Sequence, residues 1–356
     1  MPLLLAGLAL AGGSGAIRAI GMAAGLYSAW RLLTKPAPFD YTGKVVLIAG
    51  GSRGLGLVLA RQLADRGAKL VLCARDEGEL ARARVELTRR GAVAATAACD
   101  LADPVAVQAM IDDVIARFGR IDVLVNNAGV IAVGPLEDMT VADFESALDG
   151  NYRGMVHATL AVLPDMRRRG EGRIVNVTSI GGKVAVPHLL PYCAAKFAAV
   201  GFSEGLRAEA ARDGVAVTTV VPGLLRTGSP PNADFKGRHR REYAWFVIGD
   251  SLPFTSMSAE TAAERILEAC RTGTAEITLG WSAWAGQKFQ ALFPGLCADL
   301  SAVANRFLLP SPGGIGTRSA KGRESESALT RSVLTRLTRE AAAANNEIPG
   351  APASAG

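Results

Sequence analysis

Tyr192 and Lys196 stand in the order Y-x-x-x-K within SIGGKVAVPHLLPYCAAK, residues 179–196. On a helix this spacing places both side chains on one face, with about 5–6 Å between their Cβ atoms. A free phenol has a pKa near ~10 and is a poor acid or base at neutral pH. A neighbouring ammonium group stabilises the phenolate and lowers the pKa of the phenol. The spacing therefore predicts a tyrosine that performs general acid–base catalysis.

A hydroxyl group precedes this pair. Ser179 closes the run RIVNVTS, which we expect to be a strand. Its hydroxyl can hold a substrate oxygen beside Tyr192. Y-x-x-x-K alone often occurs by chance, but its position after a strand that ends in serine favours a catalytic set.

A glycine-rich turn lies nearer the N-terminus, in VLIAGGSRGLG, residues 46–56. Its spacing is G-x-x-x-G-x-G, directly after an apolar run. Gly50 can take a tight turn and let backbone amides approach a pyrophosphate. A helix that begins near Gly54 would present its amides and dipole to that anion, while Gly56 would let the helix pack closely on the sheet. We expect a dinucleotide site here; the alternative is a tight turn without a ligand.

Two arginines are expected at the adenosine end of this site. Arg53 lies inside the turn, and Arg75 follows the second predicted strand, where NAD-binding proteins usually carry an acidic residue. Arginine can bind the 2′-phosphate of NADP in a bidentate manner. The arginines therefore favour NADP(H) over NAD(H), with Asp76 as a competing ion-pair partner for Arg75.

Taken in order, these motifs resemble those of the short-chain dehydrogenase/reductase family, in its compact single-domain subfamily, over residues 42–280. The family turn T-G-x-x-x-G-x-G is present with Ala49 in place of its threonine. The segments CDL, NNAG, NYRG and PGLLRT also match the family's pattern. The resemblance implies the following cofactor-binding residues: Gly50, Ser52, Arg53, Gly54, Leu55, Gly56, Arg75, Asp100, Leu101, Asn127, Ala128, Gly129, Tyr192, Lys196, Pro222, Gly223 and Thr227.

The resemblance also implies individual roles. Asp100 would hold the adenine amino group, NNAG (residues 126–129) would support the sheet beside the cofactor, and Thr227 would hold the nicotinamide carboxamide. The backbone of Asn151 would hold a water molecule in a proton relay to Lys196.

In the implied reaction, a hydride passes between the nicotinamide and a carbonyl carbon. Tyr192 gives or takes the proton, Ser179 stabilises the oxygen, and Lys196 lowers the pKa of Tyr192 and binds the nicotinamide ribose.

The function expected from these residues is that of an NADP-dependent oxidoreductase acting on a carbonyl or secondary alcohol. Its substrate would be lipophilic: a 3-oxoacyl chain, a sterol-like ketone or a similar compound. The alternative is a non-catalytic NAD(P)-binding scaffold or redox sensor, which would have no reason to keep both Tyr192 and Lys196. By resemblance, we expect a homo-oligomer, either a dimer or a tetramer.

The elements that must position these residues alternate between short apolar runs and amphipathic helices from Lys44 onward. Runs that are apolar throughout suit strands buried on both faces. The alternation predicts an α/β fold: a Rossmann-type doubly wound parallel sheet of about seven strands with helices on both faces. Strands are expected at 44–49, 69–73, 93–98, 121–125, 172–178, 215–221 and 275–279. Helices are expected at 54–66, 76–90, 103–118, 139–149, 151–169, 190–212 and 258–271.

The predicted catalytic domain covers residues 36–285, with a substrate lid at 226–257, and a helical extension follows at 286–310. Within the lid, the basic run at 236–241 is either an anion site or a solvated face. His188, outside the lid, is either a substrate contact or an ordinary loop residue. Residues 311–356 are rich in Ala, Ser, Gly and Arg, and predict a disordered tail with a transient helix at 325–345.

Residues 1–35 form a separate apolar segment. A membrane helix needs roughly 20 apolar residues, and Arg18 interrupts the run. Trp30 beside Arg31 is typical of an interfacial anchor with its positive charge on the cytoplasmic side. Residues 1–31 therefore predict either a membrane anchor or surface-lying helix, or an arm packed on the protein itself. We expect a cytoplasmic enzyme, which would contact the membrane through this segment under the first of these two alternatives.

The composition excludes several other classes. The net charge of +6 comes without a sustained basic stripe, so we expect no nucleic-acid partner. The 5 cysteines are scattered and contain no C-x-x-C, and the 3 histidines lack metal-ligand spacing. We therefore expect no disulfide framework and no metal, and a reducing compartment fits.

Overall fold

The computed structural model describes residues 15, 19, 21–26 and 38–348. The chain divides into two units, Met1–Phe39 and Asp40–Gly356. In the first unit, residues 21–26 are helical. No helix within these described ranges is long and apolar enough to cross a membrane. Most of the segment predicted as a membrane anchor, residues 1–31, lies outside the described residues.

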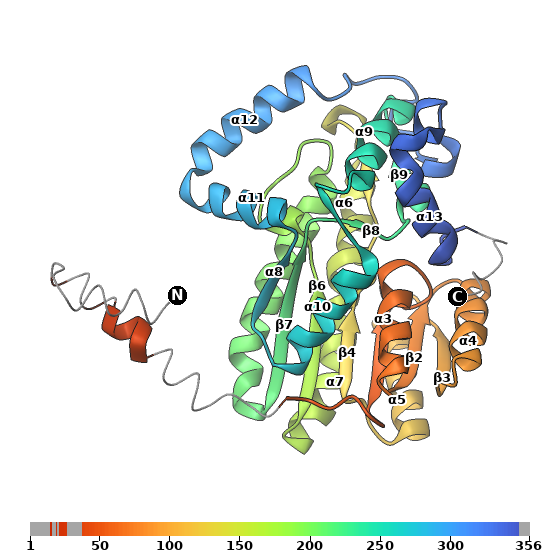
Figure 1. The fold of residues 1–356 in the computed structure, drawn as a ribbon, viewed down its shortest axis with the longest axis vertical. Coiled ribbons are helices and arrows are strands. Elements are labelled where there is room, and N and C mark those ends of the chain that lie inside the picture. The colour runs from red at the N-terminus through yellow and green to blue at the C-terminus, as the bar shows by residue number, and fades with distance from the viewer. Residues whose placement is uncertain (1–14, 16–18, 20, 27–37, 349–356) are drawn as a thin grey trace. The chain divides into compact units, whose positions relative to one another are not determined.

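A parallel sheet of seven strands forms the centre of the second unit (Figure 1). In spatial order its strands are β11 (Glu276–Leu279), β7 (Val215–Pro222), β6 (Gly172–Val177), β4 (Val123–Asn126), β1 (Val45–Ala49), β2 (Lys69–Ala74) and β3 (Ala94–Ala98). The chain runs outward from β1 to β3 and then crosses back to β4. The strand order therefore reverses between β1 and β4, where doubly wound sheets bind ligands. The predicted Rossmann-type sheet is confirmed.

Helices cover both faces of the sheet. On one face, α3 (Gly54–Asp65) packs against α10 (Ala259–Arg271), and α4 (Glu77–Arg89) packs against β2 and β3. On the other, α5 (Pro104–Phe118) packs against α7 (Gly154–Arg169), and α8 (Leu190–Ala210) packs against β7. Fully buried side chains from α5, α7 and the strands form the core here, including Ile111, Val162 and Leu47. Burial of each such side chain contributes about 1.5–3 kcal/mol to folding.

The lid region predicted at 226–257 is folded. It contains β9 (Asp234–Phe235), α9 (His239–Ser251) and β10 (Ser256–Ser258). Phe235, Tyr243 and Val247 form a small apolar core together with Leu189. Lys236 from the basic run is buried and pairs with Asp143 at 2.6 Å, so this lysine is neither solvated nor available to an external anion.

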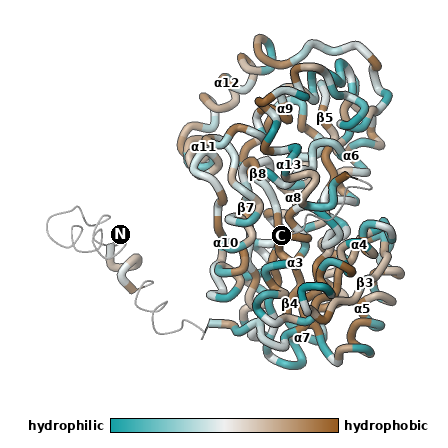
Figure 2. Tube along the Cα trace, turned by 45° about the vertical axis from the view of Figure 1, so that its right-hand side comes forward, coloured by the Kyte–Doolittle hydropathy of each residue, from teal (hydrophilic) through white to brown (hydrophobic). Residues whose placement is uncertain are grey.

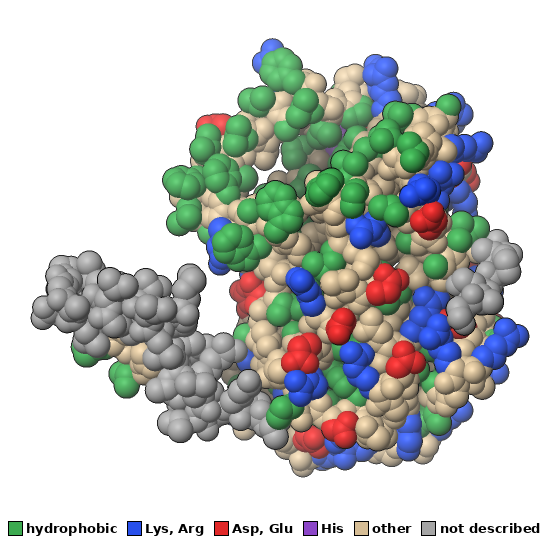
Figure 3. Space-filling view, viewed as in Figure 1, with side chains coloured by type: hydrophobic (Ala, Val, Ile, Leu, Met, Phe, Trp, Pro, Cys, Tyr) green, Lys and Arg blue, Asp and Glu red, His purple; other side chains and the backbone are tan. Residues whose placement is uncertain are grey.

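Two amphipathic helices follow the last strand of the sheet, α11 (Trp281–Leu292) and α12 (Pro294–Phe307). Hydrophobic residues, in brown, alternate along them with less hydrophobic residues in paler colours (Figure 2). Their apolar side chains are largely exposed and form a green surface over both helices (Figure 3). The exposed side chains include Trp281, Trp284, Leu292, Phe293, Leu296, Leu300, Val303 and Phe307.

The C-terminal segment differs from the disorder expected over 311–356. Residues 311–348 contain β12 (Ala320–Lys321), which pairs with β9, and α13 (Arg336–Ala344), which contacts α9. The helix is shorter than the expected 325–345. This segment is held largely through polar contacts, such as the 2.6 Å hydrogen bond between Thr338 and Ser251. A composition poor in large apolar residues therefore failed to indicate its order. Residues 349–356 lie outside the described residues.

Candidate active site

The predicted site residues gather at the carboxyl edge of the sheet. The glycine turn follows β1, NNAG begins at the end of β4, Ser179 follows β6, and Gly223 follows β7. The strand ends are level, because Ala49 is in register with Asn126 and Asn126 with Asn176. Parallel strands thus bring four separate motifs to one edge.

The glycine turn has the close packing that its spacing predicts. Gly50 has a φ of +78°, which favours glycine. A Cβ on Gly56 would collide with the Gly50 carbonyl oxygen. That oxygen also accepts a hydrogen bond from Asn127 Nδ2 at 2.9 Å. Helix α3 begins with no side-chain cap and no acidic residue in its first turn. Such a helix terminus can receive an anion.

The two arginines that were predicted to face the adenosine end of a cofactor differ in their surroundings. Arg53 Nη1 lies 3.1 Å from Glu79 Oε1, and Ser52 Oγ donates to Glu79 Oε2 at 2.8 Å. Arg75 is exposed. Asp76, its alternative partner, instead caps α4 by accepting from the Glu79 amide at 2.7 Å. Glu79 was not identified from the sequence, and it competes with any phosphate for Arg53.

The residues after β3 and β4 have distinct contacts. Asp100 is exposed and accepts from the Ala102 amide at 3.0 Å, while Leu101 is partly buried. Asn126 is buried and its Nδ2 donates to Thr159 at 3.1 Å and to Asn176 at 2.8 Å. Asn126 thus ties β4 to α7 and β6, and Asn127 ties the end of β4 to the glycine turn.

The three predicted catalytic side chains are close together. Tyr192 is hydrogen-bonded to Ser179. Lys196, on the next turn of α8, places Nζ 5.7 Å from the centre of the Tyr192 ring. Lys196 Nζ donates to the Val177 carbonyl oxygen at 3.2 Å, so the ammonium is anchored to the end of β6.

Burial controls the acidity of this pair. It raises the pKa of Tyr192 to about 12, although the hydrogen bond from Ser179 acts in the opposite direction. It also lowers the pKa of Lys196 to about 8. The sequence predicted that the ammonium would lower the pKa of the phenol. In the protein alone, desolvation of both groups is the larger effect, since each is removed from water.

Asn151 lies in a π-helical turn, Asp149–Arg153, between α6 (Val141–Leu148) and α7. Its Nδ2 donates to the carbonyl oxygens of Ala147 and Val130, both at 2.9 Å. A Cβ on Gly129 would lie 2.8 Å from Asn151 Oδ1, so this glycine leaves room for the asparagine. A π-helical turn is wider than an α-helical turn and shifts the backbone hydrogen bonds. Such turns are common at functional sites. The sequence identified Asn151 but not the π turn.

The segment after β7 lies against α11. Pro222 is the last residue of β7, and a Cβ on Gly223 would lie 2.9 Å from the Ala283 Cβ. Thr227 is buried, and its carbonyl oxygen accepts from Asn345 Nδ2 at 3.2 Å.

Comparison with known proteins identifies the family. Residues 44–234 match the family model of the short chain dehydrogenases. The chain belongs to this family. It is 38% identical to granaticin polyketide synthase putative ketoacyl reductase 1 of Streptomyces violaceoruber. The alignment covers 202 residues, which are 56% of this chain and 72% of that protein. It is 36% identical to the putative oxidoreductase SadH of Mycobacterium tuberculosis over 247 residues, 68% of this chain and 88% of that protein.

Solved structures agree with this assignment. A short-chain dehydrogenase from Streptomyces avermitilis matches with a TM-score of 0.63 and 29% identity, covering 76% of this chain and 100% of that one. A gluconate 5-dehydrogenase from Burkholderia cenocepacia, in complex with NADP and tartrate, matches with a TM-score of 0.60 and 27% identity, covering 69% and 98%. The protein is therefore an oxidoreductase that acts on CH–OH or C=O groups.

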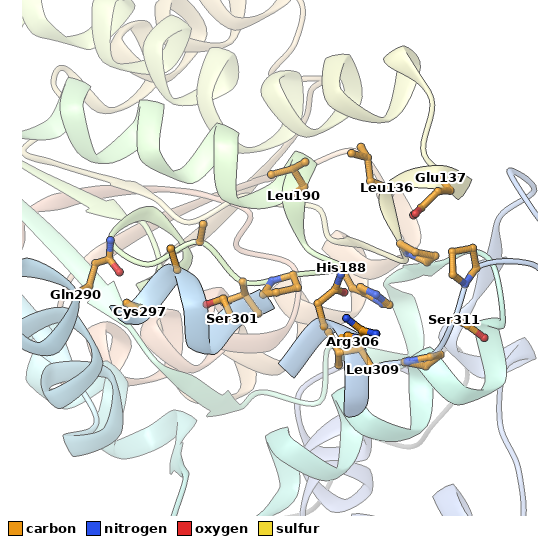
Figure 4. Close-up of a pocket in the computed structure, with 18 residues that line it drawn as sticks. Leu136, Glu137, His188, Leu190, Gln290, Cys297, Ser301, Arg306, Leu309 and Ser311 are labelled. Carbon is orange, nitrogen blue, oxygen red and sulfur yellow. The ribbon is translucent and has the colours of Figure 1, made fainter. Parts of the chain in front are cut away.

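In this short-chain dehydrogenase, a cavity of about 700 Å³ lies beside the loop that joins Ser179 to Tyr192 (Figure 4). Val186, His188 and Leu190 line it from the loop, and Cys297 and Ser301 line it from α12. The more polar face of α12 thus borders the cavity, while its apolar face is exposed.

A buried contact between a histidine and a glutamate borders the cavity. His188 Nδ1 lies 2.9 Å and 3.0 Å from the two carboxylate oxygens of Glu242, whose side chain is 0% exposed. Trp245 Nε1 also donates to Glu242, at 2.7 Å. His188 has a φ of +65°, an uncommon conformation for a residue other than glycine. No sequence pattern pointed to Glu242.

No sequence pattern pointed to residues 344–347 either. The Gly54 amide at the start of α3 donates to the Asn345 carbonyl oxygen at 2.9 Å. Asn346 Nδ2 donates to the Ser52 carbonyl oxygen at 2.8 Å. The C-terminal segment therefore reaches the glycine turn, far away along the chain.

Proposed function

We propose that this short-chain dehydrogenase is an NADP-dependent reductase of a lipophilic carbonyl substrate, able to oxidise the corresponding secondary alcohol. The observation that carries the proposal is the gathering of Ser179, Tyr192 and Lys196 at the same sheet edge as the glycine turn. This arrangement puts a proton donor and a substrate-positioning hydroxyl beside a dinucleotide cradle.

The residues at this edge fit a dinucleotide. No side chain caps α3, and the glycine turn is too tight for a Cβ on Gly56. The pyrophosphate would lie against the first turn of α3, and Arg53 and Arg75 would face the 2′-phosphate of the adenosine ribose. NADP is the preferred form because both arginines are at the adenosine end, although Glu79 reduces the contribution of Arg53.

When bound, the cofactor supplies the hydride. Ser179 would hold the substrate oxygen, and Tyr192 would donate a proton to that oxygen as it gains negative charge. Burial keeps the proton on the Tyr192 phenol at neutral pH, as a proton donor requires, but it also weakens the phenol as an acid, so the charge of Lys196 would have to favour release of the proton. Lys196 and the π turn at Asn151 would resupply that proton.

The cavity supports a substrate with an apolar body and a second polar group. Leu136, Val186 and Leu190 give it apolar walls. Because the Nδ1–H of His188 is donated to Glu242, Nε2 of the neutral ring can accept a hydrogen bond from an N–H or O–H group of the substrate. A 3-oxoacyl thioester has both features when an amide-containing arm carries it, and the ketoacyl reductase name of one relative supports the same class.

The first experiment is a fluorescence titration of the full-length protein with NADPH and with NADH. We expect NADPH to bind ~10-fold or more tightly, a difference of about 1.4 kcal/mol. Reduction of a 3-oxoacyl thioester is then measured by the loss of nicotinamide absorbance. Binding without turnover of any carbonyl substrate would instead support the alternative of a cofactor-binding scaffold.

We further infer a homo-oligomer, and contact with the cytoplasmic face of a membrane through residues 1–31. Light scattering tests the first inference. Co-flotation with anionic vesicles, with and without residues 1–31, tests the second. A monomer would contradict the first inference, and flotation that does not depend on residues 1–31 would contradict the second.

A further inference from the structure

We propose that the chain's own C-terminal segment, residues 344–347, covers the proposed cofactor site at the glycine turn and must leave before a dinucleotide binds. The proposal rests on the cofactor site inferred above. Helix α13 ends beside α3, and the residues that follow reach the glycine turn (Figure 1). The contact is an autoinhibitory one, made within a single chain.

The segment uses the same atoms that an anion would need. The amide of Gly54 is the first of α3, and it donates to the Asn345 carbonyl oxygen. Free amides at a helix start are the usual donors to a pyrophosphate. One amide cannot point at both groups, so occupation by Asn345 and by a phosphate exclude each other.

Glu347 fills the space over the turn. Its Oε1 is 2.6 Å from the position that a Cβ on Gly54 would take, so the carboxylate lies directly above that glycine. Its side chain is only 3% exposed and lies 3.5 Å from Arg53 Nε. Asn232 Nδ2 donates to its Oε2 at 2.6 Å. A carboxylate beside an arginine at a helix start takes the place of a phosphate group.

Contacts on two sides hold the segment. On the side of α3 and α4, Arg61 donates to Asn345 Oδ1 at 2.8 Å and to the Ala344 carbonyl oxygen at 2.7 Å. Arg82 Nε donates to Asn346 Oδ1 at 2.7 Å. On the other side, Asn345 donates to the Thr227 carbonyl oxygen. The segment therefore bridges the glycine turn and the lid.

Closure should weaken cofactor binding by mass action. Only the open form accepts a dinucleotide, so the apparent Kd equals the intrinsic Kd divided by the open fraction. We expect removal of residues 345–356 to lower the Kd for NADPH by about tenfold or more, which corresponds to a closed form that is about 90% populated. Glu347→Gln should lower it by a smaller factor, because it removes the charge that faces Arg53.

The test is a fluorescence titration of three chains with NADPH: the full-length protein, a chain ending at Ala344 and a chain ending at Ile348. The chain ending at Ile348 is the matched control, since it loses residues 349–356 but keeps every contact described above. We expect it to bind like the full-length protein and the chain ending at Ala344 to bind more tightly. Equal or weaker binding by the chain ending at Ala344 would overturn the proposal.

Hydrogen exchange of the full-length protein gives a second readout that does not depend on activity. Addition of NADPH should increase exchange at residues 345–348, because the bound dinucleotide displaces them. Slower exchange there would mean that the segment covers the bound cofactor, which contradicts competition. If no chain binds NADPH or NADH, the proposed function itself fails, and that result is distinct from equal binding by all three chains.

Discussion

Lys196 Nζ lies 5.7 Å from the centre of the Tyr192 ring and donates to the Val177 carbonyl oxygen at 3.2 Å. The ammonium is thus fixed by the backbone at the end of β6 rather than by a carboxylate. With burial as the main influence, the pKa of Lys196 is lowered to about 8 and that of Tyr192 is raised to about 12. The two groups therefore titrate in well-separated pH ranges.

The activity should consequently depend on the charge of Lys196. Above pH about 8 the amine loses its proton, while Tyr192 keeps its own up to about 12. We expect kcat/KM for reduction to fall as the pH rises through about 8, because the lysine can no longer resupply a proton. A pH profile of kcat/KM measures this. In Lys196→Arg the guanidinium stays charged, so the lower activity of that variant should show no inflection near this pH. A flat wild-type profile across this range contradicts the assignment.

Replacement of Tyr192 by Phe should greatly slow turnover but leave cofactor binding intact. Loss of a general acid costs about 10²–10⁴-fold in rate. Tyr243→Phe is a matched control, since Tyr243 is buried in the lid core outside the catalytic set. Single-turnover rates and NADPH titrations of both variants provide the measurement. Turnover that survives in Tyr192→Phe would remove the phenol from the mechanism.

The choice between NADPH and NADH should depend on Arg53, Arg75 and Glu79. In the chain ending at Ala344, where Arg53 has no contact with Glu347, the double variant Arg53→Ala, Arg75→Ala should raise the Kd for NADPH about tenfold and leave the Kd for NADH unchanged. Glu79→Gln should lower the Kd for NADPH, because it removes the carboxylate that pairs with Arg53. Arg84→Ala, an exposed arginine on α4, is the charge control. If the double variant lowers NADH binding equally, the arginines do not read the 2′-phosphate.

The sheet could be predicted from sequence because its strands carry their own signal. β1 is apolar and buried at every position, as expected for a strand covered on both faces. The proximity of Tyr192 and Lys196 could also be predicted, since the two residues are neighbours on one helix. Their acidity could not, because it depends on how deeply the folded chain buries them.

Contacts between segments that are far apart in the sequence could not be predicted, because no sequence pattern marks them. Glu242 meets His188 only once the lid has folded. Asn345 reaches the amide of Gly54 through its backbone carbonyl group, so no side-chain type could have indicated that contact. The order of residues 311–348 was missed for a related reason: hydrogen bonds to the lid and to α3 hold a segment that lacks large apolar residues.

Gly56→Ala should destabilise the protein and weaken cofactor binding. A Cβ there would collide with the Gly50 carbonyl oxygen, so α3 would have to shift away from the turn. We expect a loss of about 1–3 kcal/mol in the free energy of unfolding. Gly201→Ala, within α8, is the control: nothing lies near its Cβ position, and helix propensity should add about 0.5–1 kcal/mol. Denaturant unfolding of both variants measures the difference, and equal stabilities would mean that the turn can relax.

His188 should determine which substrates are accepted. His188 lines the cavity, and the hydrogen bond between its Nδ1 and Glu242 fixes the orientation of the ring. We expect His188→Ala to reduce kcat/KM about tenfold for a 3-oxoacyl thioester, as loss of a hydrogen bond worth ~1–1.5 kcal/mol predicts, and to change it little for a simple ketone of similar length. Glu242→Gln should give a smaller effect in the same direction, because the amide still orients the ring. Leu190→Ala, on the same wall of the cavity, is the control for lost apolar contact and should affect both substrates alike. If His188→Ala reduces kcat/KM equally for both substrates, the role of His188 is to hold Glu242 of the lid in place and not to recognise the substrate.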